Sequence, residues 1–424
     1  MLSPNRRKPE SPRYAARMLP RRRHELPPTA GLPLRLDDLR PGAPTLAADI
    51  AIQLGTPPLQ LECSGTACLL ITLIALHALQ PQRRRVVVPA FTCPLVAIAV
   101  QQAGLELQLC DLRPGHYDMD PAALRAACDE QTLAIVPTHL AGRVADVADA
   151  LTVARNVGAY VVEDAAQALG ARVDGVSVGL LGDVGFFSLA AGKGLSIYEG
   201  GLLLTRDASL RERLASVAAG RVPSSVWMEC RRSLELIGYT ALYRPHGLGL
   251  AYGNPLRHAL RRGDPVAAVG DDFPLSIPLH RVGRWRQAVG AHAAVRLPAF
   301  LEQLWTQAQR RLPRLRAIDG IEVMDDPLGA QGTWPFLLLL LPDQQRRDAA
   351  LAQLWESGMG VSRLFIHALP DYTYLTDIVP AQDVPNARDF AARSLTISNS
   401  PWLDDDTFEM ICQTLERVLA KLPV

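Results

Sequence analysis

Between residues 60 and 205, short apolar runs alternate with segments of helical pattern, and this alternation restricts the chain to few folds. Four of the runs have the length and composition of buried strands: RVVVPA (85–90), LELQLCD (105–111), TLAIVPTH (132–139) and AYVVEDAA (159–166). Strands that alternate with helices form mainly parallel sheets covered by helices on both faces. The sequence therefore predicts an α/β fold, in which ligands bind at the carboxyl ends of the strands.

The pattern divides the chain into four predicted parts. Residues 1–47 form a basic N-terminal tail and lead-in, 48–220 the large domain, 221–280 an inserted arm or hairpin, and 281–424 a small α+β C-terminal domain. The insert breaks the alternation and mixes aromatic residues, arginines and glycines. It is interpreted either as a helical hairpin packed on the main body or as a dimer arm, with contact to a membrane surface as a third interpretation.

Composition excludes several classes of protein. A net charge of +1 gives no electrostatic basis for binding nucleic acid. The seven cysteines form no C-x-x-C pair, so the sequence predicts neither a disulfide framework nor a metal site, and a reducing cytoplasm is the expected location. No apolar run reaches the roughly 18 to 20 residues of a transmembrane segment. The Arg-rich N-terminus imitates an organelle transit peptide, but Glu10 and the prolines disfavour that interpretation.

One lysine, Lys193, lies between glycines in FFSLAAGKGLSIYEGG, just beyond an apolar run. A phosphate-binding P-loop would need glycine at Phe187 and Ser or Thr at Gly194, so this interpretation fails. The chain has 44 basic residues, of which Lys193 is the one lysine away from the termini. Because a guanidinium forms no imine whereas a desolvated amine does, Lys193 is predicted to form a Schiff base.

Three other loops are expected at the same edge of the sheet. CSGTA (63–67) opens a helix whose free N–H groups suit a phosphate, although the same residues also form an ordinary helix cap. Glu163 and Asp164 end a strand one helical turn before Gln167, and Ser188 lies five residues before the lysine. Together they supply what a pyridoxal 5′-phosphate (PLP) enzyme needs: an imine-forming lysine, a carboxylate for the pyridine nitrogen and a phosphate cradle.

The ordered motifs SGTA, VPAFT, VPTHLAG, VEDAAQALGA, GDVGFFSLAAGK and EGG resemble those of the DegT/DnrJ/StrS sugar aminotransferases, which are fold-type-I PLP enzymes. The resemblance covers residues 60–205 well and the C-terminal part loosely. It implies a mainly parallel seven-stranded sheet with helices on both faces. It implies Lys193 as Schiff-base lysine and proton shuttle, Asp164 at the pyridine nitrogen and Gln167 near the ring hydroxyl. The phosphate would be held by Thr66, Ala67 and Ser188.

The chain departs from the family at several positions. Cys93 stands where an aromatic side chain usually stacks on the cofactor ring, so Phe91 or His139 is a candidate for that role. Arg281 matches the arginine of an Asn-x-Arg motif that reaches into the partner subunit's site, but Leu279 stands at the asparagine. Family dehydratases carry histidine at the lysine position, so Lys193 favours transamination.

The resemblance implies a homodimer with active sites at the subunit interface, glutamate as amino donor and a nucleotide-linked keto sugar as acceptor. The expected function is transfer of an amino group to that sugar for polysaccharide or glycoconjugate biosynthesis. Two alternatives stay open. One is the same reaction on a keto-cyclitol or a lipid-linked sugar, and the other is a non-catalytic scaffold that binds a sugar nucleotide.

Overall fold

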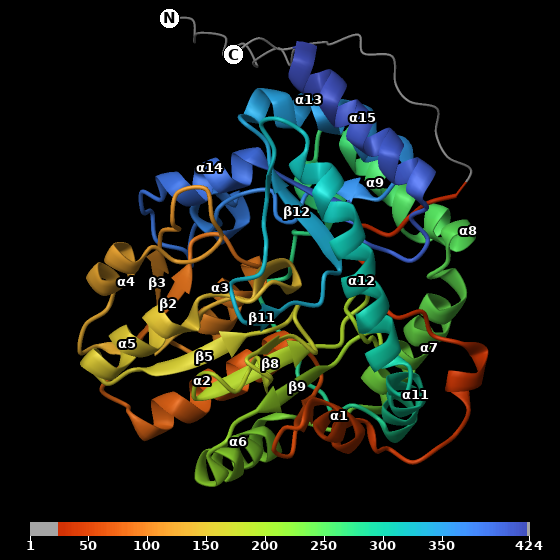
Figure 1. Ribbon diagram of the computed structural model, residues 1–424. Helices are drawn as coiled ribbons and strands as arrows, with labels where there is room; N and C mark the ends of the chain where they lie inside the picture. The colour runs from red at the N-terminus through yellow and green to blue at the C-terminus, as the bar shows by residue number, and fades with distance from the viewer. Residues whose placement is uncertain (1–23, 422–424) are drawn as a thin grey trace, which may run out of the picture.

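The structure is a computed structural model that describes residues 24–421. Two sheets form the two halves of the molecule (Figure 1). The large sheet lies in the lower half, and the small sheet lies above it with helices α13 (Gln344–Leu354) and α15 (Asp405–Lys421). The part of the predicted tail before residue 24 falls outside the described residues, and the four domain boundaries remain predictions.

The large sheet has seven strands in the order β1-β9-β8-β5-β4-β2-β3. Neighbouring strands from β8 to β3 run parallel, whereas β9 pairs antiparallel with both β8 and β1. The prediction of a mainly parallel α/β sheet is therefore confirmed. The strands are β1 (Gln60–Glu62), β2 (Arg85–Pro89), β3 (Glu106–Cys110), β4 (Thr132–Ile135), β5 (Tyr160–Asp164), β8 (Val184–Ser188) and β9 (Gly201–Leu204).

Helices cover the large sheet because the segments between strands carry apolar residues and caps. The most buried of them begins after Ser64, whose side-chain oxygen accepts a hydrogen bond from the Ala67 N–H (3.0 Å). Ten of its fifteen residues are buried, so it packs between the sheet and neighbouring helices. The helices are α2 (Gly65–Leu79), α3 (Pro94–Gln102), α4 (Pro121–Ala127), α5 (Val147–Val157) and α6 (Ala208–Arg221).

The small sheet has the order β10-β12-β14-β13 and is antiparallel throughout. The helical pattern of residues 284–312 predicts one continuous helix, and this prediction is wrong. Two helices form instead, because Pro298 at the second position of the later helix lacks the N–H that a continuous helix would need. The elements are α11 (Arg284–Ala294), α12 (Leu297–Arg316), β10 (Glu322–Val323), β12 (Phe336–Leu340), β13 (Val361–Ser362), α14 (Pro385–Arg393) and β14 (Ser394–Ser398).

The insert, residues 221–280, is helical as expected, but it contains more elements than a hairpin. Its helices lie along one side of the molecule, from α7 at the level of the large sheet to α9 at the level of the small sheet (Figure 1). Among residues 24–421, no helix combines the length and apolar content required to cross a lipid bilayer. The elements are α7 (Val226–Leu242), α8 (Pro245–Leu248), the π-helix η3 (Gly249–Gly253), α9 (Asn254–Arg261) and α10 (Pro265–Val269).

Candidate active site

A cavity of about 620 Å³ lies at the carboxyl ends of β5 and β8 and at the N-terminus of α2. Its walls come from the large sheet, the small sheet and the insert. The structure brings most of the predicted site residues together there. Those that line the cavity are Thr66, Cys93, His139, Asp164, Gln167, Ser188 and Lys193.

Lys193 lies in a tight loop after β8. Gly192 adopts a positive φ of 77°, which favours glycine, and the Lys193 N–H donates to the Ala190 carbonyl (3.1 Å). Burial of the ammonium lowers the pKa of Lys193, and the nearby charges of Cys93 and Asp164 only partly oppose this. The side chain is thus an amine that loses its proton more easily than an exposed lysine does.

Asp164 ends β5 and is 4% exposed. One of its oxygens, Oδ1, accepts a hydrogen bond from the Ala166 N–H (3.0 Å). Burial raises the pKa of this carboxyl, while the Ala166 hydrogen bond and the charge of Lys193 lower it in part. A protonated ring nitrogen beside Asp164 would supply the positive charge that the buried carboxylate needs.

His139 lines the cavity, and hydrogen bonds at both ring nitrogens hold its imidazole in place. Its Nδ1 accepts a hydrogen bond from the Ala145 N–H (3.0 Å), and its Nε2 lies 2.9 Å from the Glu163 Oε2. The ring is therefore neutral, with the proton on Nε2, which donates to Glu163. Glu163 is not a helix cap, because main-chain N–H groups enclose its carboxylate. They belong to Gly179 (2.8 Å), Leu181 (2.6 Å) and Gly182 (2.7 Å).

The N-terminus of α2 and Ser188 form the end of the cavity that suits an anion. A Cβ at Gly65 would lie 3.1 Å from the Ser188 Cβ, so glycine lets the two segments approach. Thr66 and Ser188 line the cavity as predicted, but Ala67 does not. The Ser64 side chain takes the Ala67 N–H, so this group is not directed to a ligand.

Of the two candidates for ring stacking, only His139 borders the cavity. Phe91 packs edge-to-face against Phe365 and Phe390 in the core. Cys93 lines the cavity as well, and burial raises the pKa of its thiol to about 12. His139 therefore fits the stacking role better than Phe91.

Arg281 lies away from this cavity, in a separate hollow of about 430 Å³ that also includes Glu62. Its Nε donates to the Val222 carbonyl (3.3 Å). Its role toward a partner subunit remains a prediction.

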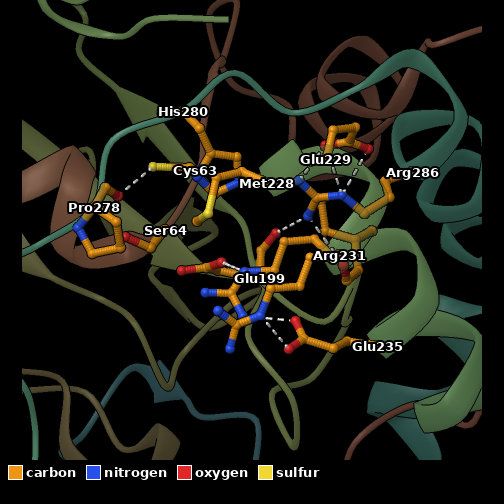
Figure 2. Close-up of polar contacts among 12 residues, drawn as sticks. Cys63, Ser64, Glu199, Met228, Glu229, Arg231, Glu235, Pro278, His280 and Arg286 are labelled. Atoms are coloured by element: carbon orange, nitrogen blue, oxygen red, sulfur yellow. Dashed lines mark hydrogen bonds and ion pairs between the residues drawn. The ribbon is translucent and has the colours of Figure 1, made fainter. Parts of the chain in front are cut away.

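Sequence reasoning missed an arginine on α11 that ties the insert to the lysine-bearing part of the chain. Arg286 is fully buried and donates to both oxygens of Glu229 on α7, at 2.7 to 3.1 Å (Figure 2). It also donates to the Glu199 carbonyl (2.6 Å). The Glu199 side chain forms an ion pair with Arg232 on α7, and both residues line the cavity. The arginines on both sides of Trp285, in the sequence R-W-R (284–286), were the one sequence feature that could have drawn attention to Arg286.

The residues at the cavity fit PLP. A buried lysine, a buried carboxylate with one hydrogen bond, and the N-terminus of a helix meet in one space, and each matches a different group of the cofactor. A buried lysine opposite a carboxylate at the strand ends of such a sheet defines the class of fold-type-I PLP proteins. Within this class, residues 60–241 form a domain of the DegT/DnrJ/EryC1/StrS aminotransferase family, whose model they match.

Curated relatives and solved structures agree with this family. The chain is 38% identical over 152 residues to a UDP-N-acetyl-3-dehydro-alpha-D-glucosamine 3-aminotransferase of Acidithiobacillus ferrooxidans, covering 36% of this chain and 41% of the relative. It is 37% identical over 182 residues to an L-glutamine:2-deoxy-scyllo-inosose aminotransferase of Streptomyces lividus, covering 41% and 42%. The matched regions span less than half the length of these relatives.

A solved structure extends the likeness beyond the matched domain. The PLP form of a putative sugar aminotransferase, Spr1654 from Streptococcus pneumoniae, superposes with a TM-score of 0.68. The superposition covers 95% of this chain and all of the other, at 17% sequence identity. Both halves of the molecule therefore share this fold.

Proposed function

We propose that this protein is a PLP-dependent aminotransferase that moves an amino group from glutamate to a keto sugar. The observation that carries the proposal is the convergence of buried Lys193, buried Asp164 and the α2 N-terminus in one cavity. The named relatives, which aminate a UDP-linked keto sugar and a keto-cyclitol, support an acceptor of this kind.

When bound, the cofactor supplies a carbonyl for the amino group and a ring that withdraws electrons. Asp164 keeps the ring nitrogen protonated, because a buried carboxylate stabilises a positive charge. Lys193, with its lowered pKa, would take a proton from the substrate carbon that bears the amino group and deliver it to the cofactor carbon that receives that group. His139 supports the ring face as a neutral imidazole, because Glu163 and Ala145 fix its tautomer.

The other side chains bind and orient. The Thr66 and Ser188 hydroxyls and the first N–H groups of α2 bind the phosphate. Gln167 would bind the ring hydroxyl through its Nε2, because its Oε1 already accepts the Ala141 N–H (2.7 Å). Burial of these groups excludes water from the reacting carbon.

The finer features belong to the same proposal. A nucleotide-linked acceptor is supported by the UDP-linked relative, and the inosose relative supports a keto-cyclitol as the second candidate. A homodimer is supported by the position of Arg281 outside its own cavity, where it is available to a partner. Seven cysteines that form no disulfide support a cytoplasmic location.

A spectroscopic experiment tests the proposal. The purified protein with PLP should be yellow, lose the colour with glutamate or glutamine, and regain it with a keto sugar. The Lys193→Ala protein is the control and should not complete the cycle. A wild-type protein that binds PLP but reacts with neither donor would contradict the proposal and favour the non-catalytic scaffold.

A further inference from the structure

The insert builds a wall of the chain's own cavity. Its last segment, from the end of α10 to Pro278, lines the same cavity as the lysine loop. Earlier parts of the insert add one side chain from α7 and one from the π-helix. The wall residues used here are Arg232, Tyr252, Gly270, Asp271, Phe273 and Ile277.

Asp271 anchors this wall to the small-sheet half. Its Oδ2 accepts hydrogen bonds from the Tyr372 hydroxyl (2.6 Å) and from the Ile366 N–H (3.0 Å). Its main-chain carbonyl accepts a third from the Tyr374 hydroxyl (2.6 Å). The position of the carboxylate is therefore fixed from outside the cavity by groups about a hundred residues further along the chain.

The other carboxylate oxygen of Asp271, Oδ1, takes no part in this anchor. Both side-chain hydrogen bonds end on Oδ2, and within residues 24–421 none reaches Oδ1. No described cation lies within ion-pair distance of the carboxylate, although the residue is only 4% exposed. Asp271 lines the cavity and lies close enough to Cys93 to affect its ionisation, so its carboxylate belongs to the same space as Lys193.

A purely structural role would not require this arrangement. The oxygen of an amide would accept the same two hydrogen bonds from Tyr372 and Ile366 without the cost of burying a charge. The hydrogen bonds from Tyr372 and Ile366 therefore require neither the negative charge of Asp271 nor its second oxygen. A carboxylate oxygen that faces a binding cavity accepts hydrogen bonds from hydroxyl groups of a ligand.

We propose that Oδ1 of Asp271 accepts a hydrogen bond from a hydroxyl group of the acceptor, so that the insert favours ketones that carry hydroxyl groups over ketones that carry none. This inference rests on the proposed function and names the residue of the same site that recognises the acceptor. Arg363 also lines the cavity, but its Nη2 donates to the Ile366 and Ala391 carbonyls (2.7 and 2.8 Å), and within residues 24–421 no hydrogen bond joins it to Asp271.

Separate half-reactions test the inference. The Asp271→Asn protein is compared with wild type, and Asp272→Asn is the matched control because Asp272 is the exposed neighbour outside the cavity lining. The donor half-reaction uses glutamate and glutamine. The acceptor half-reaction uses UDP-N-acetyl-3-dehydro-alpha-D-glucosamine and 2-deoxy-scyllo-inosose, with 2-oxoglutarate as a keto acceptor that carries no hydroxyl group.

Asp271→Asn should lower kcat/KM for the hydroxylated ketone roughly 10- to 100-fold, as expected for a hydrogen bond to a charged group. Its donor rates should stay within about twofold of wild type, and 2-oxoglutarate should react no more slowly. Unchanged kinetics with the ketones, an equal loss in both half-reactions, or a wild type that aminates neither ketone would overturn the inference. A wild type that reacts with no donor would instead overturn the proposed function.

Discussion

Replacement of Asp271 by asparagine should stabilise the protein at neutral pH while it impairs acceptor recognition. Burial raises the pKa of Asp271 from 3.8 to about 6, and the Tyr372 and Ile366 hydrogen bonds offset only part of this. The folded pKa lies above the unfolded one, so the folded state binds more protons between these values. The free energy of unfolding therefore falls as the pH rises through this window.

The magnitude follows from the shift. The folded and unfolded pKa values differ by about two units, and each unit corresponds to about 1.4 kcal/mol, so ionised Asp271 costs roughly 3 kcal/mol at pH 8. At pH 5 the same calculation gives roughly 1.5 kcal/mol. The asparagine Oδ1 can accept from both Tyr372 and Ile366 and carries no charge. The variant should therefore gain about 3 kcal/mol at pH 8 and about half of that at pH 5.

Urea unfolding followed by tryptophan fluorescence at pH 5 and pH 8 measures both values. The exposed Asp272→Asn protein is the control and should match wild type at each pH. A gain that is the same at both pH values would show that the effect does not come from the Asp271 charge. A variant less stable than wild type at pH 8 would refute the argument outright, because it would mean that the carboxylate is a net stabilising group.

Three further predictions concern the cofactor site and the sheet. Borohydride reduction of the PLP-loaded protein should leave a pyridoxyl group on the peptide AAGKGLSIYEGG, and the Lys193→Arg protein should take no label; mass spectrometry that finds the label on another lysine would exclude Lys193. Asp164→Asn should bind PLP but slow the glutamate half-reaction roughly 10²- to 10³-fold, about 2 to 4 kcal/mol, and stopped-flow rates equal to wild type would contradict its assignment. Gly185→Ala should not give folded protein, because the new Cβ would lie 2.2 Å from the Gly179 Cα; circular dichroism like that of wild type would contradict this packing.

The residues assigned to the chemistry, Lys193 and Asp164, could be predicted from the sequence because their positions depend on the local pattern of strands and loops. Asp164 ends and Lys193 follows a continuous apolar run of strand length, and parallel strands bring their carboxyl ends to one edge of the sheet. The sequence also indicated that Glu163 and Asp164 point in different directions. Successive residues of a strand point to opposite faces, so only one of the two carboxylates could face the cavity.

The contacts that fix the insert beside the cavity could not be predicted in this way. Asp271 and Tyr372 are 101 residues apart, and Arg286 and Glu229 are 57 apart. Arg286 and Glu229 lie on separate helices, and Asp271 and Tyr372 lie in irregular segments, so nothing local indicates which side chains meet. Such contacts depend on how the insert folds back onto the sheets, which is a property of the whole chain.

The part of the cavity lining that comes from the insert has a consequence for how this protein could change. Lys193 and Asp164 follow strands of the large sheet, whereas residues within 269–278 line the cavity without belonging to that sheet. A mutational library restricted to 269–278 should therefore change the use of acceptors more than it changes the reaction with the amino donor. New specificity would then arise in this segment while the lysine and the aspartate stay unchanged.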